Sequence, residues 1–373
     1  MLITAAILAI FVYGIIAAML GTILPDISQR FSLTPKQNGN IALFQAVGLI
    51  IGSFCVGPLM DMEGKQVGML LGLALVAAAL FLLRGAGGYQ PVVVAMTLLG
   101  IGGGIVVTAA NSLNPDIRPD NPAAVSNLLN LFFGLGGLVT PLVSAKLFQK
   151  KPRSLTLFAA TLAILGLLAS AVAPFKPATG QVSSQFSAVG GLLTNPHLLA
   201  LSAMLFLYVT CEVGVWNWLV RHLIAQGVPE SKALTILSLG FALGLLIGRI
   251  GASQILEQVN PKTVLSGAAA LMAITSFLML RSSSPGVAQA LVFLAGLAMA
   301  PVFPTVLGVV GNDFKSGSGA TAIGIAVTFG WLGLVVSSPI IGGIAGDDPK
   351  GLKKALLVIP AASLIMFLVS FAL

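Results

Sequence analysis

The feature that most constrains this chain is a series of twelve long apolar runs. A helix crosses the hydrocarbon core of a bilayer with about 20 mostly apolar residues, which is the length of these runs. Charged side chains make up only 8% of the 373 residues, whereas soluble domains have about 25%. The sequence therefore predicts an all-α polytopic membrane protein with twelve transmembrane helices. The runs are residues 2–24, 38–60, 66–83, 91–113, 122–147, 154–174, 197–225, 231–257, 262–281, 286–310, 318–345 and 352–372.

A polar stretch rich in Ser, Pro and Gln separates the sixth run from the seventh. We expect an N-terminal six-helix bundle over residues 1–174 and a C-terminal six-helix bundle over residues 197–373. Residues 175–196 are then a central cytoplasmic linker.

The two sets of six runs also repeat. At a constant offset of 196 residues, Ala46–Gly52 aligns with Ala242–Gly248, and Phe133–Val139 aligns with Phe329–Val335. A constant offset at corresponding runs is stronger evidence for an internal repeat than the identity of the aligned apolar residues. Two parallel six-helix repeats, related by an axis along the membrane normal, are the architecture of major facilitator transporters, and we expect that fold here.

Glycines recur on the aligned runs. Gly48 and Gly52 are four residues apart, as are Gly244 and Gly248, so each pair lies on one helix face. Helices in lipid associate through close backbone approach, which glycine permits. The pairs indicate either tight static packing or a surface on which helices of opposite halves slide, and we favour the sliding surface.

The segment that follows the second run carries an acid and a base. It reads Gly57-Pro58-Leu59-Met60-Asp61-Met62-Glu63-Gly64-Lys65 and resembles the major facilitator loop signature G-x-x-x-D-x-x-G-K/R. Because such a pair can hold one conformation and release in the other, Asp61 and Lys65 are predicted gating residues, with a solvated loop as the alternative. Gly248-Arg249, with Asn260-Pro261-Lys262, resembles a degenerate second copy and adds Arg249 to the predicted gate.

Several short motifs lie along nearly the whole chain: Thr108-Ala109-Ala110-Asn111, the segment from Asn127 to Pro141, Leu207-Tyr208-Val209 through Trp216, and Pro304-Thr305. In these motifs the chain resembles the fucose/galactose/glucose–proton symporter family. The resemblance implies a sugar site in a central cavity that is reached alternately from either side. It carries over five substrate-binding residues: Asn111, Asn127, Asn130 (a glutamine in the family), Trp216 and Phe303 (a tyrosine in the family's fucose transporter).

The chain departs from that family at the coupling residues. Gly21 and Val107 stand where the family has proton-titrating carboxylates, and Phe133 replaces an asparagine. Glu212 is the clearest acid deep in a span, and such residues usually face a cavity and are functional. We predict it as the coupling residue, acting as a proton carrier, a Na⁺ ligand or a direct acceptor for sugar hydroxyls, with structural pairing as the alternative.

Two further side chains are weaker candidates for substrate contact. Gln45 has interhelical hydrogen bonding as its alternative role, and Trp331 has helix packing.

Enzyme chemistry is not indicated. The two histidines, His197 and His222, lie near helix ends without a His/Cys/Asp cluster, so we expect no metal site. The glycine run Gly100–Gly104 lacks the Lys-Ser/Thr pair of a phosphate loop, and we expect no cofactor. The net charge of +8 is scattered over short loops, which indicates lipid headgroups rather than nucleic acid as the partner.

These observations predict a monomeric, secondary active or facilitative transporter of a neutral monosaccharide, either a hexose or a deoxyhexose. It would work by alternating access in a bacterial inner membrane, with H⁺ or Na⁺ as the candidate coupling ion. A major facilitator exporter of amphiphilic or drug-like compounds is the first alternative, favoured by the apolar residues Val107, Phe133 and Phe303. A non-transporting membrane receptor or scaffold is the second.

The charges of the loops conflict with the expected orientation. With a cytoplasmic amino terminus, the outside loops hold more basic residues than the inside loops, which is opposite to the positive-inside rule. We keep the cytoplasmic amino terminus because the loop signature and the long linker are cytoplasmic in the family. The inside set is Lys65, Arg118, Lys176, Arg249, Lys262 and Lys315, and the outside set includes Arg30, Lys36, Arg84, Lys146, Lys150, Lys151, Arg153 and Lys354.

Overall fold

The computed structural model describes residues 1–148, 151–178, 185–282, 284–314, 317–346 and 349–373, and every regular element among them is helical. Lys150 and Lys315 of the basic loops, and residues 179–184 of the expected linker, lie outside this part. Within the described residues, twelve helical segments are long and apolar enough to cross a membrane. The predicted fold class and number of spans are therefore confirmed.

The chain divides into two compact units. Unit 1 comprises Met1–Pro122, Leu129–Leu193 and Val310–Thr328, and unit 2 comprises Ala123–Leu128, Thr194–Val309 and Phe329–Leu373. Each unit thus consists mainly of one sequence half and includes short helical segments from the other.

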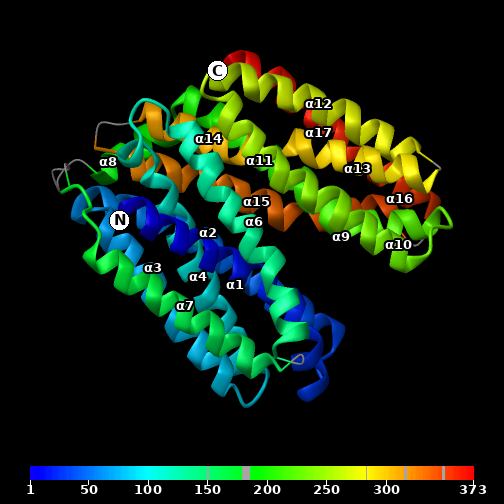
Figure 1. Ribbon diagram of the computed structural model, residues 1–373, viewed down its shortest axis with the longest axis horizontal. Helices are drawn as coiled ribbons and strands as arrows, with labels where there is room; N and C mark the ends of the chain where they lie inside the picture. Colours follow the sequence, from blue (N-terminus) through cyan, green and yellow to red (C-terminus); the bar gives the residue numbers. More distant parts are fainter. Residues whose placement is uncertain (149–150, 179–184, 283, 315–316, 347–348) are drawn as a thin grey trace. The chain divides into compact units, whose positions relative to one another are not determined.

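Unit 1 is built on closely packed pairs of helices. In it α2 packs on α4, and α3 packs on both α4 and α7; Figure 1 shows α3 beside α7. The helices of the first sequence half are α1 (Leu2–Arg30), α2 (Pro35–Glu63), α3 (Lys65–Gly85), α4 (Tyr89–Ser112), α5 (Asn114–Ile117), α6 (Pro122–Lys146), α7 (Pro152–Val172) and α8 (Gln185–Leu193).

Unit 2 repeats this style of packing. In it α11 packs on α13, and α12 packs on α13 and α17; Figure 1 shows α12, α13 and α17 side by side. The elements of the second half are α9 (Pro196–Ala225), α10 (Glu230–Thr235), η2 (Ile236–Ala242), α11 (Leu243–Ile255), α12 (Pro261–Arg281), α13 (Pro285–Met299), α14 (Val302–Asp313), α15 (Gly319–Ala345), α16 (Pro349–Ala355), α17 (Val358–Val369) and η3 (Ser370–Ala372).

Several helices begin at a polar cap followed by proline. Thr34 accepts a hydrogen bond from the Gln37 N–H and forms a capping box ahead of α2. The Asn195 and Asn260 side chains cap α9 and α12 in a similar way. Proline fits the first turn because its missing N–H would have no helical partner there. These caps determine where the three helices begin.

Large apolar side chains cover outward faces of both units. Leu168, Leu271 and Leu368 are each more than half exposed. In water such a surface would drive aggregation, whereas in a bilayer it contacts acyl chains. The exposure of these leucines therefore agrees with a multi-pass membrane protein.

The sequence repeat is also a repeat of backbone contacts. A Cβ atom added at Gly48 would lie 2.4 Å from the carbonyl oxygen of Thr97, and one added at Gly244 would lie 2.4 Å from that of Phe293. Thr97 and Phe293 are separated by the same 196 residues as the glycines. The α2–α4 and α11–α13 interfaces are therefore equivalent.

These contacts correct the interpretation of the glycine pairs. Gly48 and Gly52 lie against α4, and Gly244 and Gly248 lie against α13, so each pair faces a helix of its own half. The expected sliding surface between opposite halves is wrong for these four residues. Close backbone packing inside each half explains their size, because any side chain would collide with the neighbouring helix.

Three spans of the second half are irregular, and the twelfth is interrupted at Leu356 and Leu357, between α16 and α17. The eighth span contains the π-helical segment η2 between α10 and α11, and such segments occur frequently at functional sites. The tenth span is interrupted at Ala300 and Pro301, between α13 and α14. Proline supplies no N–H and ends a regular ladder. The irregular segments of the eighth and tenth spans each have an aromatic residue in them or beside them, Phe241 in η2 and Phe303 at the start of α14.

Candidate functional site

Glu212 has buried neighbours that its own helix does not reveal. It lies in the middle of α9, and Tyr208 lies one turn before it. The Tyr208 hydroxyl is wholly buried and interacts electrostatically with both the Glu212 carboxylate and the Arg249 guanidinium of α11. Unit 2 therefore holds an acid, a base and a phenol close together within its spans.

Arg249 has a different setting from the one that the loop signature suggested. It lies inside the eighth span, between Glu230 and Ile255, and is only 4% exposed. Burial of a cation in an apolar span is unfavourable unless polar groups compensate it. Its position beside Tyr208 makes it part of the same polar group as Glu212.

Aromatic rings lie beside this polar group. The Tyr208 and Phe303 ring centroids are 6.3 Å apart, and those of Phe303 and Trp331 are 6.5 Å apart. Further along α9, Trp216 meets Phe241 of η2 edge-on at 5.3 Å, and its side chain is 39% exposed. Unit 2 thus combines apolar ring faces with buried polar groups.

Asn127 adds a buried amide to unit 2. Its Nδ2 atom donates to the Thr305 hydroxyl and to the Ala123 carbonyl, both at 3.0 Å. Its Oδ1 atom is buried and has no hydrogen-bond partner among the described residues. Because an unpaired buried acceptor is unfavourable, this oxygen is suited to receive a hydroxyl from a bound ligand or water.

Unit 1 brings two other predicted residues together. Asn130 of α6 donates through Nδ2 to the Oδ1 atom of Asn111 at 3.1 Å, and Asn111 donates to the Val107 carbonyl at 2.9 Å. Both asparagines are buried. Phe133 stacks on Tyr13 at 5.3 Å. Gln45 lies on α2, where its backbone carbonyl is packed tightly against Gly100 of α4.

The acid of the loop signature has its partners on another helix. The Asp61 carboxylate accepts hydrogen bonds from the backbone N–H groups of Ala320 (3.0 Å) and Thr321 (2.8 Å), and from the Thr321 hydroxyl (2.6 Å). These N–H groups are at the start of α15, where the helix dipole favours a negative charge. Asp61 therefore caps a helix from the other half of the sequence.

The base of the signature has separate partners. Lys65 Nζ pairs with the Asp116 carboxylate at 2.6 Å and donates to the Ser112 carbonyl at 2.8 Å. Lys176 reaches the same carboxylate at 3.3 Å. Lys65 thus holds the end of α4 and the short helix α5.

Sequence reasoning missed several members of these groups. Tyr208 is visible there only within a motif, and Thr305 only beside a proline, whereas Arg249 is predicted as a gating residue and not as a neighbour of Glu212. Thr321 belongs to no motif at all. A buried arginine in an apolar span was the one available signal, because such a residue needs a polar partner.

Metal binding finds no support in these groups. Among the described residues, no three His, Cys, Asp or Glu side chains gather in a way that would hold a metal ion.

Twelve candidate membrane spans among the described residues, with buried polar groups inside them, define a multi-pass membrane protein. The chain belongs to the Major Facilitator Superfamily, whose family profile matches residues 6–338. Its fold and family are those of transporters rather than of enzymes.

Named relatives and solved structures agree with this assignment. The chain is 23% identical to the membrane protein MosC of Rhizobium meliloti over 371 residues, covering 98% of this chain and 88% of MosC. It is similar to the structure of FucP in the outward conformation, with a TM-score of 0.84, 20% identity and coverage of 99% and 98%; FucP is the E. coli fucose:proton symporter. The proton:xylose symporter XylE gives a TM-score of 0.81 at 15% identity, with coverage of 100% and 94%.

Proposed function

We propose that this protein transports a neutral monosaccharide across a bacterial inner membrane by alternating access. The observation that carries the proposal is the grouping of Tyr208, Glu212 and Arg249 beside the rings of Phe303 and Trp331. Aromatic faces pack on the C–H face of a sugar ring, while a carboxylate and a guanidinium bind its hydroxyls through charge-assisted hydrogen bonds. The sugar symporters FucP and XylE share the fold, which supports this choice of substrate class.

The buried amides are assigned to the same task. Within unit 2, Asn127 has an unpaired Oδ1 atom that can accept a sugar hydroxyl. Within unit 1, the hydrogen-bonded pair Asn111–Asn130 is proposed for sugar contact as well. Gln45 and Trp216 are assigned supporting contacts. Amides suit hydroxyl groups because each amide both donates and accepts hydrogen bonds.

Glu212 is our proposed coupling residue, and H⁺ is the proposed ion. A sodium site needs several oxygen ligands and no competing cation, whereas the Arg249 guanidinium acts on the same hydroxyl as Glu212. A proton needs only the carboxylate. Binding of a sugar hydroxyl to Glu212 would then be linked to the protonation of this group.

Asp61, Lys65 and Arg249 are the proposed gating residues. Asp61 is the best supported, because its three hydrogen bonds join α2 to the start of α15. A helix cap of this kind can be released as a unit, since all of its bonds end on one carboxylate. Lys65 would hold α4 and α5 during that release.

Counterflow of labelled sugars into proteoliposomes tests the function. Vesicles loaded with one unlabelled hexose or deoxyhexose should accumulate the labelled form of a matching sugar, and empty vesicles should not. Failure of every neutral monosaccharide in the panel would reject the proposal. Sugar binding without any counterflow would instead select the receptor or scaffold alternative.

A second candidate is export of amphiphilic compounds. The tilted Tyr208–Phe303–Trp331 rings and the Tyr13–Phe133 stack favour it, because they offer apolar surface within the spans. Competition decides between the two candidates. Hydrophobic cations or detergents would displace a bound probe if the protein is an exporter, and hexoses would displace it if the protein is a sugar transporter.

A further inference from the structure

A basic pocket lies at one end of unit 1, away from the residues assigned to transport. It has a volume of about 350 Å³, and it lies where α1 and α3 end and where α4 and α7 begin. Four cationic side chains line it: Arg30, Arg84, Lys151 and Arg153. They all belong to the loops whose positive charge conflicts with the expected orientation.

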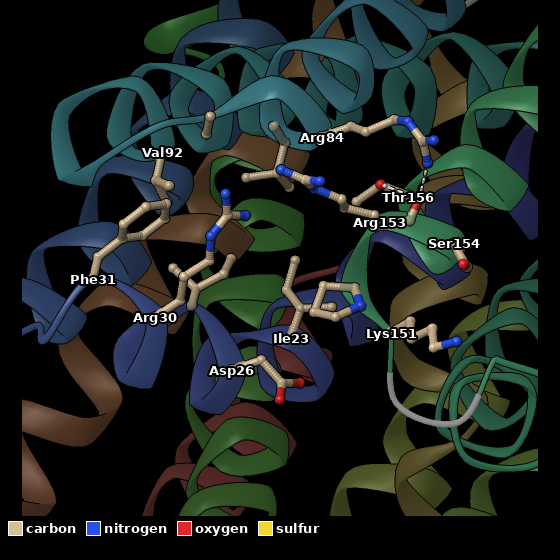
Figure 2. Close-up of a pocket in the computed structure, with 14 residues that line it drawn as sticks. Ile23, Asp26, Arg30, Phe31, Arg84, Val92, Lys151, Arg153, Ser154 and Thr156 are labelled. Carbon is tan, nitrogen blue, oxygen red and sulfur yellow. Dashed lines mark hydrogen bonds between the residues drawn. The ribbon is translucent and has the colours of Figure 1, made fainter.

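Two of these arginines extend into the same hollow. Figure 2 shows Arg30 from α1 and Arg153 from α7 reaching into the pocket from opposite sides. Arg30 rests on the Phe31 ring at 4.9 Å, and Arg84 donates to the backbone carbonyl of Arg153. None of the four cations is paired with a carboxylate among the described residues. Four like charges that line one pocket, with a single carboxylate (Asp26) to offset them, favour a bound anion.

The N-terminus of α7 also favours binding of an anion in this pocket. Arg30 and Arg84 complement the negative ends of α1 and α3, as expected for helix dipoles. Lys151 and Arg153 do the opposite, because they lie at the positive end of α7, which has no acidic residue in its first turn and no side-chain cap. The positive end of a helix and two cations therefore act at the same place, and an anion would compensate both.

The pocket is also apolar. Ile23, Ile27, Leu83 and Val92 line it beside the charged groups, and its position at the helix ends puts it at the depth of a membrane–water interface. Asp26 is the one acidic residue in the lining, and it offsets one of the four positive charges. A small inorganic anion would use the charges and leave the apolar wall unused, whereas a phospholipid would use both.

We propose that this pocket binds the headgroup of an anionic phospholipid. The phosphate lies between Arg30 and Arg153, Lys151 supports it from the rim, and the first carbons of the acyl chains contact the apolar wall. Basic pockets between transmembrane helices are a known form of lipid recognition. The proposal is independent of the transported substrate.

Native mass spectrometry of the purified full-length protein tests the site. The probes are phosphatidylglycerol, zwitterionic phosphatidylcholine and sn-glycerol 3-phosphate, which has the phosphate without acyl chains. We expect phosphatidylglycerol to bind at least tenfold more tightly than either of the others. Arg30→Gln and Arg153→Gln should each weaken it about tenfold, the size of one lost charge-assisted contact.

Two further variants distinguish the loss of the binding site from damage to the fold. Lys36→Gln removes a basic residue of the same set outside the pocket and should leave binding unchanged. Asp26→Asn should strengthen binding, a gain that a merely damaged fold cannot produce. Equal binding of the two lipids, or wild-type binding by both arginine variants, would overturn the proposal. Binding of sn-glycerol 3-phosphate as tight as that of phosphatidylglycerol would assign the site to a free phosphate and overturn the lipid.

Discussion

Asp61 and Thr321 are 260 positions apart, yet the Asp61 carboxylate accepts hydrogen bonds from both the backbone N–H and the hydroxyl of Thr321, at 2.8 and 2.6 Å. Asp61 is 9% exposed, so water competes little for these bonds. A single side chain therefore holds the end of α2 to the start of α15.

Removing the negative charge of Asp61 should weaken the contact between α2 and α15. Asp61→Asn removes the charge and leaves one acceptor oxygen where the carboxylate uses two. At least one bond is therefore lost, and the bonds that remain fall from about 1.5–3 kcal/mol to about 1 kcal/mol. A loss of ~1.4 kcal/mol raises the separated population about tenfold. Ser53 is fully buried on α2, and its carbonyl faces Gly324 of α15. In a Ser53→Cys, Cys55→Ser background, Asp61→Asn should speed labelling by a water-soluble maleimide.

Asp120→Asn is the matched control for this experiment. Asp120 pairs with Arg118 at the surface, and its side chain is 71% exposed. Exposed pairs of this kind contribute about 0–1 kcal/mol, so the labelling rate should not change. Equal rates in Asp61→Asn and the parent would show that Asp61 does not hold α2 to α15.

Gly57 gives a steric test of the same contact. A Cβ atom at this position would lie 2.6 Å from the Thr321 Cα atom, so Gly57→Ala must push α2 from α15. In the same background, we expect the thiol introduced at position 53 to be labelled faster than in the parent, as predicted for Asp61→Asn. Gly39→Ala lies on the same helix with open space around its Cβ and should give the parent rate. Acceleration by both alanines would point to a general effect on α2 instead.

A Tyr208→Phe variant distinguishes a role of the Tyr208 hydroxyl in substrate binding from a role of the Tyr208 ring in packing. Its hydroxyl is wholly buried and makes no hydrogen bond of good geometry among the described residues. Tyr208→Phe keeps the ring that packs near Phe303, so the midpoint of thermal unfolding should shift by only a few degrees. The KM for sugar should rise several-fold, since the hydroxyl lies beside Glu212 and Arg249.

Tyr89→Phe is the control for this variant, because the Tyr89 hydroxyl accepts a hydrogen bond from Asn40, far along the chain from Glu212 and Arg249. It should change neither the KM nor the midpoint. A Tyr208→Phe protein with wild-type KM would remove Tyr208 from the substrate site.

Much of the fold follows from the sequence for a simple reason. Span number depends on local apolar runs, and helix starts depend on local caps such as Thr34-Pro35, so neighbouring residues contain the information. The repeat of Gly48 and Gly244 was visible as well. Their partners Thr97 and Phe293 were not, because no local pattern says which helix a glycine face meets.

The candidate site, like the fold, could be predicted from the sequence only in part. Glu212 stands out because an acid in an apolar run is unfavourable without a reason. Its neighbour Arg249 comes from another span, and the Asn111–Asn130 hydrogen bond joins α4 to α6. Such pairings are fixed by three-dimensional packing, and periodicity along one helix does not encode them.

The most direct test of the central claim compares two glutamate variants in sugar uptake driven by a pH gradient. Glu212→Gln removes the charge beside Tyr208 and Arg249, and Glu230→Gln removes an exposed charge from the first turn of α10. We predict that Glu212→Gln loses sugar accumulation driven by a pH gradient while Glu230→Gln keeps it. Accumulation by Glu212→Gln with unchanged rate and pH dependence would contradict the account.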